Sequence, residues 1–176
     1  MVIGGHRALE LVNTVAWRLD PARTEERLPD DDALRRWAEA AGFTPVAVDG
    51  GVAEVRALRE AAYQVLRPLA TGTAPGDPEP VRRLIVGALG RAAIASVAPL
   101  DWRIAVHGTS DLPAALALEV WRLLQFEDLT RLRECADEAC GWLFLDRSRN
   151  GSRRWCSSGD CGNRDRARRH YRRTHT

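Results

Sequence analysis

The residues best suited to chemistry in this chain are its four cysteines, which all fall near the C-terminal end. They form two pairs with the same spacing, Cys135-x4-Cys140 and Cys156-x4-Cys161, with fifteen residues between the pairs. Thiolates are soft ligands, and four of them suit one tetrahedral Zn²⁺ that keeps no open position for a substrate. The spacing therefore predicts one structural zinc ion held by four cysteines, and it argues against metal catalysis. A redox switch or disulfides are the alternatives, since four cysteines allow three disulfide connectivities.

Arginines crowd around the second cysteine pair and beyond it. Residues 1–130 hold 14 Arg against 18 acidic residues, a net charge of −4, whereas residues 131–176 hold 12 Arg against 6, a net charge of +6. The chain has no lysine, which the coding bias of a GC-rich genome explains, but such a bias does not explain clustering. Zinc with four thiolates adds −2, so residues 135–176 fall from a net charge of +5 to about +3 when metal is bound.

A basic cluster of this kind predicts an anionic partner, and DNA fits best because Arg binds phosphates and can contact guanine in the major groove. A solvated basic tail, or salt bridges to the acidic N-terminal part, are the alternatives. The candidate nucleic-acid-binding residues are Arg147, Arg149, Arg153, Arg154, Arg164, Arg166, Arg168, Arg169, Arg172 and Arg173.

We call residues 131–176 the cysteine module. Residues 142–145 are typical of a strand, Asn150-Gly151 favours a hairpin turn, and residues 153–155 would form the returning strand. A helix over 162–173 would follow, with Ala167 and Tyr171 facing inward. The order of knuckle, hairpin, second knuckle and helix resembles a treble-clef finger, and a module this small needs the metal for its folding free energy.

The first 130 residues predict a helical domain. Helices are expected over residues 6–19, 30–41, 52–69, 81–89 and 112–128 from apolar side chains at three- and four-residue steps. A short β-hairpin is expected between residues 92 and 106, where β-favouring residues flank a proline turn. The predicted fold is therefore mainly α with a small β-hairpin: a helical N-terminal domain (1–130) followed by a treble-clef-like zinc finger (131–176).

Several motifs of the cysteine module resemble the CGNR zinc-finger family. They are Cys161-Gly162-Asn163-Arg164, Arg154-Trp155-Cys156-Ser157, Phe144-x-Asp146 and Cys135-x4-Cys140. The segment Gly5-x3-Leu9-Glu10-x2-Asn13-Thr14 is similar to the opening motif of the ABATE domain, with Glu10 in place of an expected Asp. The resemblance implies a C-terminal DNA-binding module after a helical domain, in a stress-induced transcription regulator.

The N-terminal domain offers weaker signals. Asn13 and Thr14 are polar residues within an apolar stretch, so with His6 they are candidates for a ligand pocket, or else a buried pair bonded to a neighbouring backbone. No nucleophile elbow, phosphate loop or carboxylate pair is present, and we expect no enzyme. The hypothesis is a cytoplasmic DNA-binding regulator whose helical domain senses a small effector or forms a homodimer, with no membrane segment. The alternative is a zinc-stabilised protein-interaction module.

Overall fold

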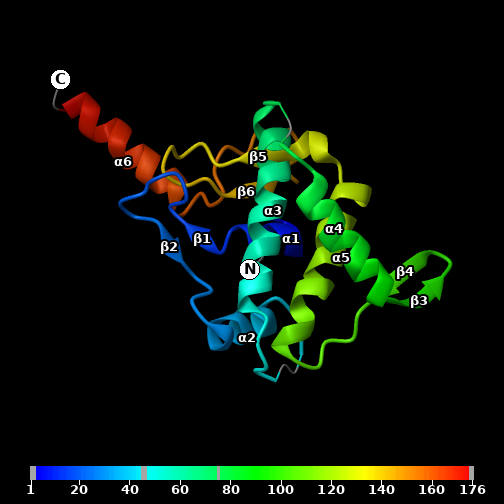
Figure 1. Cartoon of the computed structure of the whole chain (residues 1–176). Helices are drawn as coiled ribbons and strands as arrows, with labels where there is room; N and C mark the ends of the chain where they lie inside the picture. Colours follow the sequence, from blue (N-terminus) through cyan, green and yellow to red (C-terminus); the bar gives the residue numbers. More distant parts are fainter. Residues whose placement is uncertain (1–2, 45–46, 75, 175–176) are drawn as a thin grey trace.

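The computed structural model describes residues 3–44, 47–74 and 76–174. Within these described ranges, five α-helices build the N-terminal part: α1 (Arg7–Val12), α2 (Asp31–Ala40), α3 (Val52–Thr71), α4 (Glu79–Arg91) and α5 (Leu112–Phe126). Helix α5 lies at the centre because almost every residue from Leu112 to Val120 is buried, and α1, α3 and α4 pack around it (Figure 1). No helix within the described ranges is both long and apolar enough to cross a bilayer.

Among the residues that the structure describes, three small antiparallel strand pairs accompany the helices. Strand β1 (Val15–Ala16) pairs with β2 (Glu25–Glu26), β3 (Ala93–Val97) with β4 (Leu100–Arg103), and β5 (Leu132–Glu134) with β6 (Leu143–Leu145). The β3–β4 hairpin confirms the strand prediction for residues 92–106, and it projects from the body on the side opposite α6 (Cys161–Thr174) (Figure 1). The mainly α fold class with a small finger is thus confirmed.

The first expected helix, over residues 6–19, is too long. Helix α1 ends at Val12, Asn13 is its C-cap, and the chain continues into β1 and a left-handed turn at Trp17 (φ 52°). The helical period continues in the sequence, but the Asn13 side chain bonds to the distant β6 strand. Those tertiary bonds replace the next helical turn.

The strand pairing expected within the cysteine module is wrong. Strand β6 pairs with β5, which precedes the first knuckle, rather than with residues 153–155. Asp146 explains the difference: its fully buried carboxylate accepts the backbone N–H groups of Ser148 (2.9 Å) and Arg153 (2.9 Å). The Asp146 side chain therefore bonds backbone N–H groups that we expected to pair with a neighbouring strand. The Asn150-Gly151 turn closes a loop instead of a hairpin.

The cysteine module shares its core with the helices. Leu132, Leu143 and Leu145 belong to the same buried cluster as residues of α1, α3 and α5. The four cysteines and Phe144 form a second, smaller cluster against Trp142 and Trp155. The strands therefore anchor the module to the helical part, while the cysteines pack among themselves.

Candidate metal centre and nucleic-acid interface

The four cysteines meet at one point. Their sulfur atoms all lie within 4.8 Å of one another and all four residues are buried. The Sγ atoms of Cys156 and Cys161 are 3.4 Å apart, and those of Cys140 and Cys156 are 3.7 Å apart. A tetrahedral zinc ion with Zn–S bonds of about 2.3 Å would hold its sulfurs about 3.8 Å apart. The donor set, its closure and its spacing fit one structural Zn²⁺.

The electrostatics of the cluster favour a bound cation. Contact with the neighbouring cysteines, Cys140 first, lowers the pKa of the Cys135 thiol, whereas contact with Cys135 above all raises the pKa of Cys140 and of Cys156. Crowded thiols can thus lose one proton easily but not several, because each new negative charge opposes the next. A bound divalent cation removes that obstacle by neutralising the thiolates.

The motif Cys161-Gly162-Asn163-Arg164 contributes more than a ligand. The Gly162 N–H donates to the Ser157 carbonyl (3.0 Å), which closes the second knuckle, and the Asn163 amide donates to the Gly159 carbonyl. Arg164 donates to the Cys161 sulfur (2.8 Å) and lies over the Trp17 ring, 4.2 Å from its centre. The motif therefore shapes the start of α6 around the metal site.

A buried aspartate ties the two knuckles together. Asp137, inside the first knuckle, is fully buried and pairs with Arg164 (3.1 Å) and Arg168 (3.1 Å) from α6. Burial alone would raise the pKa of Asp137, but the guanidinium groups of Arg168 and Arg164 outweigh it and hold that pKa below its usual value. The carboxylate stays charged and fixes the direction in which α6 leaves the metal site.

The N-terminal segment holds the first knuckle from the other side. Asn13 exchanges two hydrogen bonds with the backbone of Leu143, donating at 2.8 Å and accepting at 2.9 Å. The Trp142 indole donates to the Val15 carbonyl (2.8 Å), and the Arg18 N–H donates to the Cys140 carbonyl (3.1 Å). We call residues 3–19 the docking segment. The approach is so close that a Cβ at Gly141 (φ +69°) would meet Leu19 at 2.9 Å.

Helix α3 supports the same knuckle. The Tyr63 hydroxyl donates to the Gly141 carbonyl (3.2 Å), and Arg67 pairs with Glu134 (2.7 Å). Burial raises the pKa of Tyr63 to about 12, so the hydroxyl keeps its proton and remains a donor. Arg18 lies over the Tyr63 ring, 4.1 Å from its centre, and pairs with Glu60 of α3. Helix α3 therefore holds the first knuckle through a hydrogen bond and an ion pair.

The ten candidate arginines separate into two groups. Arg147 and Arg153 donate to the Gly5 carbonyl (3.2 Å) and the Ile3 carbonyl (2.9 Å), and Arg164 and Arg168 pair with Asp137. These four hold the module together. Arg147 and Arg168 are nevertheless exposed, as are the other six, of which Arg166 donates to the Ser158 carbonyl (3.1 Å): Arg149, Arg154, Arg166, Arg169, Arg172 and Arg173.

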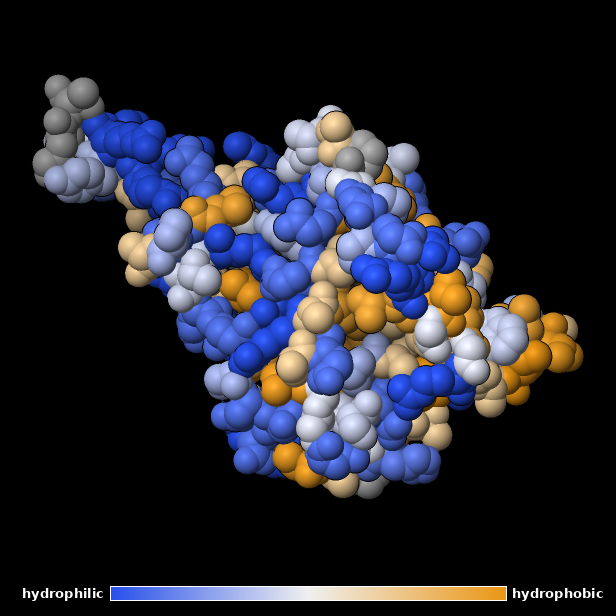
Figure 2. Space-filling view, viewed as in Figure 1, coloured by the Kyte–Doolittle hydropathy of each residue, from blue (hydrophilic) through white to orange (hydrophobic). Residues whose placement is uncertain are grey.

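The outer part of α6 forms a basic arm, which we define as residues 165–174. Only Cys161 and Gly162 of the helix are buried, and the arm projects from the body with a hydrophilic surface (Figures 1 and 2). Arg166, Arg169 and Arg173 border a shallow hollow on it. The expectation that Ala167 and Tyr171 face inward is wrong, because both are exposed, Tyr171 by 62%. The arm has no core to pack against.

The candidate ligand-binding residues do not share one cavity. His6 caps α1 by accepting the Ala8 N–H (3.2 Å), and Asn13 stands at the other end of that helix. The Thr14 hydroxyl donates to the Leu11 carbonyl (2.7 Å) and accepts from Arg59 (3.0 Å). Because the polar atoms of Asn13 and Thr14 are engaged by neighbouring groups, we assign both residues a structural role.

Comparison with known families accounts for both halves of the molecule. The CGNR zinc-finger model matches residues 131–174. The ABATE model, described as "Putative stress-induced transcription regulator", matches residues 5–126, which is more than half of the chain. The chain belongs to the ABATE family. No curated protein matches it.

In this ABATE protein the opening motif has a physical purpose that its sequence did not reveal. Leu9 packs in the core while Asn13 binds β6, so the motif joins the ABATE region to the CGNR finger. Sequence reasoning also missed Asp137. The available signal was an acid between two metal-binding cysteines, opposite a helix rich in arginine, but its partners Arg164 and Arg168 lie 27 and 31 positions away.

Proposed function

We propose that this protein is a cytoplasmic transcription regulator that binds DNA through the basic arm of its zinc finger. The observation that carries the proposal is the arm itself, a helix end that buries nothing and presents Arg166, Arg169, Arg172 and Arg173. Apart from Asp165, which pairs with Arg169 (3.0 Å), the helix contains no acidic residue. Like charges so close oppose helix formation unless a polyanion neutralises them.

The dimensions of the arm suit a duplex. An α-helix with its side chains is about 10–12 Å wide, and the major groove of B-DNA is about 12 Å wide. Ten residues of helix span about 15 Å, enough to lie across several base pairs. The ion pairs of Asp137 with Arg164 and Arg168, which we call the Asp137 clamp, would hold the arm at a fixed angle to the metal site. Zinc would then orient the helix, and the arginines would contact the phosphates.

The alternative of a protein-interaction module has less support. If the module bound its own acidic N-terminal part, α6 would fold back onto it, whereas the helix points away from the body (Figure 1). An acidic partner protein remains the competing outcome of the test below.

Gel retardation of zinc-loaded protein on duplex DNA across a salt series tests the proposal. Replacing Arg166, Arg169 and Arg173 by Gln should weaken binding and make the negative slope of log K against log salt shallower by about 2.7, since each phosphate contact contributes about −0.9. The matched control replaces the exposed helix residues Arg82, Arg83 and Arg91 of α4 by Gln, which removes the same charge elsewhere and should leave the slope unchanged.

Two outcomes would overturn the proposal. Absence of retardation at roughly 50 mM salt would exclude DNA binding, because electrostatic binding is strongest at low salt. Equal losses in the arm variant and the α4 variant would show that net charge, rather than the arm, drives binding.

A further inference from the structure

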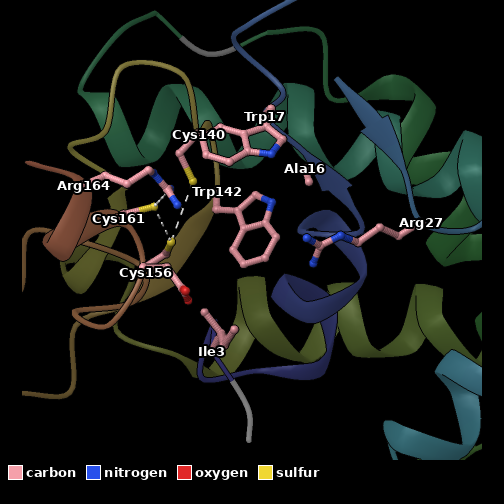
Figure 3. A pocket seen from close by; sticks show the side chains of 10 residues that line it. Ile3, Ala16, Trp17, Arg27, Cys140, Trp142, Cys156, Cys161 and Arg164 are labelled. Carbon is pink, nitrogen blue, oxygen red and sulfur yellow. Dashed lines mark hydrogen bonds between the residues drawn. The ribbon is translucent and has the colours of Figure 1, made fainter. Parts of the chain in front are cut away.

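A cavity of about 250 Å³ lies where the docking segment meets the cysteine module, beside the metal site. Ile3, Ala16 and Trp17 line it from the docking segment, and Trp142 and Arg164 line it from the cysteine module. Three of the four metal ligands, Cys140, Cys156 and Cys161, border it as well. Figure 3 shows the two indole rings facing this space, with the sulfur atoms on one side and Arg27 on the other.

The walls of the cavity combine aromatic surface with one arginine, Arg27, that is not part of an ion pair among the described residues. Arg164 is occupied by Asp137 and by the Cys161 sulfur. Arg27 lies over the Trp142 ring, 5.0 Å from its centre, and has no carboxylate within ion-pair distance in the part of the chain that the structure describes. A guanidinium group beside an aromatic face, with no acidic partner, is well placed to take a carboxylate from a ligand.

The charges around the cavity fix the orientation of such a ligand. The zinc thiolate centre would carry a net charge of −2, and Asp160, which lines the cavity, directly precedes Cys161, so an anionic group is repelled at that end. Arg27 stands at the opposite end, beyond Trp142 (Figure 3). An apolar ring can approach the sulfurs, and a carboxylate can reach only Arg27 without an unfavourable contact.

We propose that this cavity binds a small monocyclic aromatic carboxylate, with its ring against Trp142 and Trp17 and its carboxylate on Arg27. The size agrees, since about 150 Å³ suffices for benzene and the remaining volume admits a carboxylate. Offset or edge contacts between the ring and the indoles add attraction beyond the buried area.

The position gives the ligand a regulatory purpose, which rests on the proposed function. The occupant would touch the docking segment on one side and, on the other, Cys161 and Arg164 at the start of α6. Binding would therefore stiffen the connection between the ABATE region and the basic arm. The effector site lies between the two regions instead of inside the helical one.

Isothermal titration of the zinc-loaded full chain with benzoate tests the site. Benzoate should bind, benzamide should bind at least tenfold more weakly because it lacks the charge, and cyclohexanecarboxylate should also bind more weakly because it lacks the aromatic ring. The variant Arg27→Gln should lose benzoate affinity at least tenfold. Its fold is not at risk, because the side chain is exposed and the backbone bond from the Arg27 N–H to the Thr14 carbonyl (2.9 Å) remains.

The matched control is Arg23→Gln. Arg23 is also exposed and also lies over an indole, 3.5 Å from the centre of Trp17, but it does not line the cavity. Its benzoate affinity should equal that of the unchanged protein. No heat of benzoate binding up to millimolar concentrations, or equal affinities in the Arg27 and Arg23 variants, would overturn the site.

The failure of this inference can be distinguished from failure of DNA binding. Gel retardation of Arg27→Gln without benzoate should match that of the unchanged protein, since Arg27 lies outside the basic arm. Benzoate binding without any DNA retardation would support the proposed ligand site and reject DNA binding. DNA retardation without benzoate binding would reject the ligand site alone.

Discussion

The two knuckles have the same cysteine spacing but different surroundings. The first, residues 135–140, is held by the docking segment: its Ala139 and Cys140 carbonyls accept N–H groups from that segment, and Asp137 inside it is fully buried. The second, residues 156–161, exposes Ser158, Gly159 and Asp160 and runs directly into the basic arm. The two knuckles therefore bind the metal in the same way but differ in what else they do. The first anchors the metal site to the helical part, and the second leads into the basic arm.

The difference shows how a small metal site can link two regions. Each knuckle supplies two of the four thiolates, so the ion joins an anchored half to an exposed half. The Asp137 clamp duplicates that link with ion pairs to α6. The arm needs both connections because none of its own residues is buried.

Zinc removal should have the largest effect, and the two knuckles should respond to it differently. Structural zinc contributes on the order of 10 kcal/mol of apparent binding free energy in zinc-finger peptides. After chelation, hydrogen exchange should show loss of amide protection over residues 156–174. The amides of Leu143 and Leu145 should stay protected, because both residues lie in the core shared with α1 and α3.

Reloading with zinc is the control for that experiment and should restore protection over residues 156–174. The comparison breaks down if β6 loses its protection together with α6. In that case the first knuckle would depend on the metal as much as the second does.

Asn13→Ala should have the next largest effect, because it removes the hydrogen bonds that join the docking segment to β6. The change removes both hydrogen bonds to Leu143 and leaves a buried N–H and a buried carbonyl without their side-chain partner. Each unsatisfied buried group costs about 1–3 kcal/mol, so we expect a loss of about 3 kcal/mol in the free energy of unfolding. Urea denaturation of the zinc-loaded protein measures it, with the exposed Asn150→Ala as the control. Equal unfolding midpoints for the two variants would contradict the anchoring role.

Asp137→Asn should have the smallest effect, and it tests the ion pairs between the first knuckle and α6. The substitution breaks the ion pairs with Arg164 and Arg168, but these arginine side chains are 35% and 47% exposed, so solvent screens part of the loss. We expect a loss of about 1 kcal/mol in stability, unchanged zinc stoichiometry, and faster hydrogen exchange along α6. Glu138→Gln, an exposed neighbour in the same knuckle, is the control and should change none of these. Unaltered exchange in α6 of Asp137→Asn would assign the direction of the arm to the metal alone.

Local pattern was sufficient for much of the fold. The helices expected over residues 30–41, 52–69, 81–89 and 112–128 are α2, α3, α4 and α5, with ends that differ by at most two residues. Their apolar spacing is a property of consecutive residues, which a sequence displays directly. The end of α1 and the partner of β6 were missed, because both are decided by bonds to residues far away in the chain: Asn13 to Leu143, and Leu132 to Leu145.

By itself, the sequence determined the metal-binding chemistry, the helical character of the N-terminal part and the concentration of arginine at the C-terminal end. Residue type decides all three, because thiolates favour zinc and charge adds regardless of conformation. The tertiary structure alone decided which arginines bind Asp137 or the docking segment, and it alone placed Arg27 and Trp142 around one cavity. Those distinctions depend on burial and on contacts between residues up to 150 positions apart, such as Arg153 and Ile3, which only the folded chain creates.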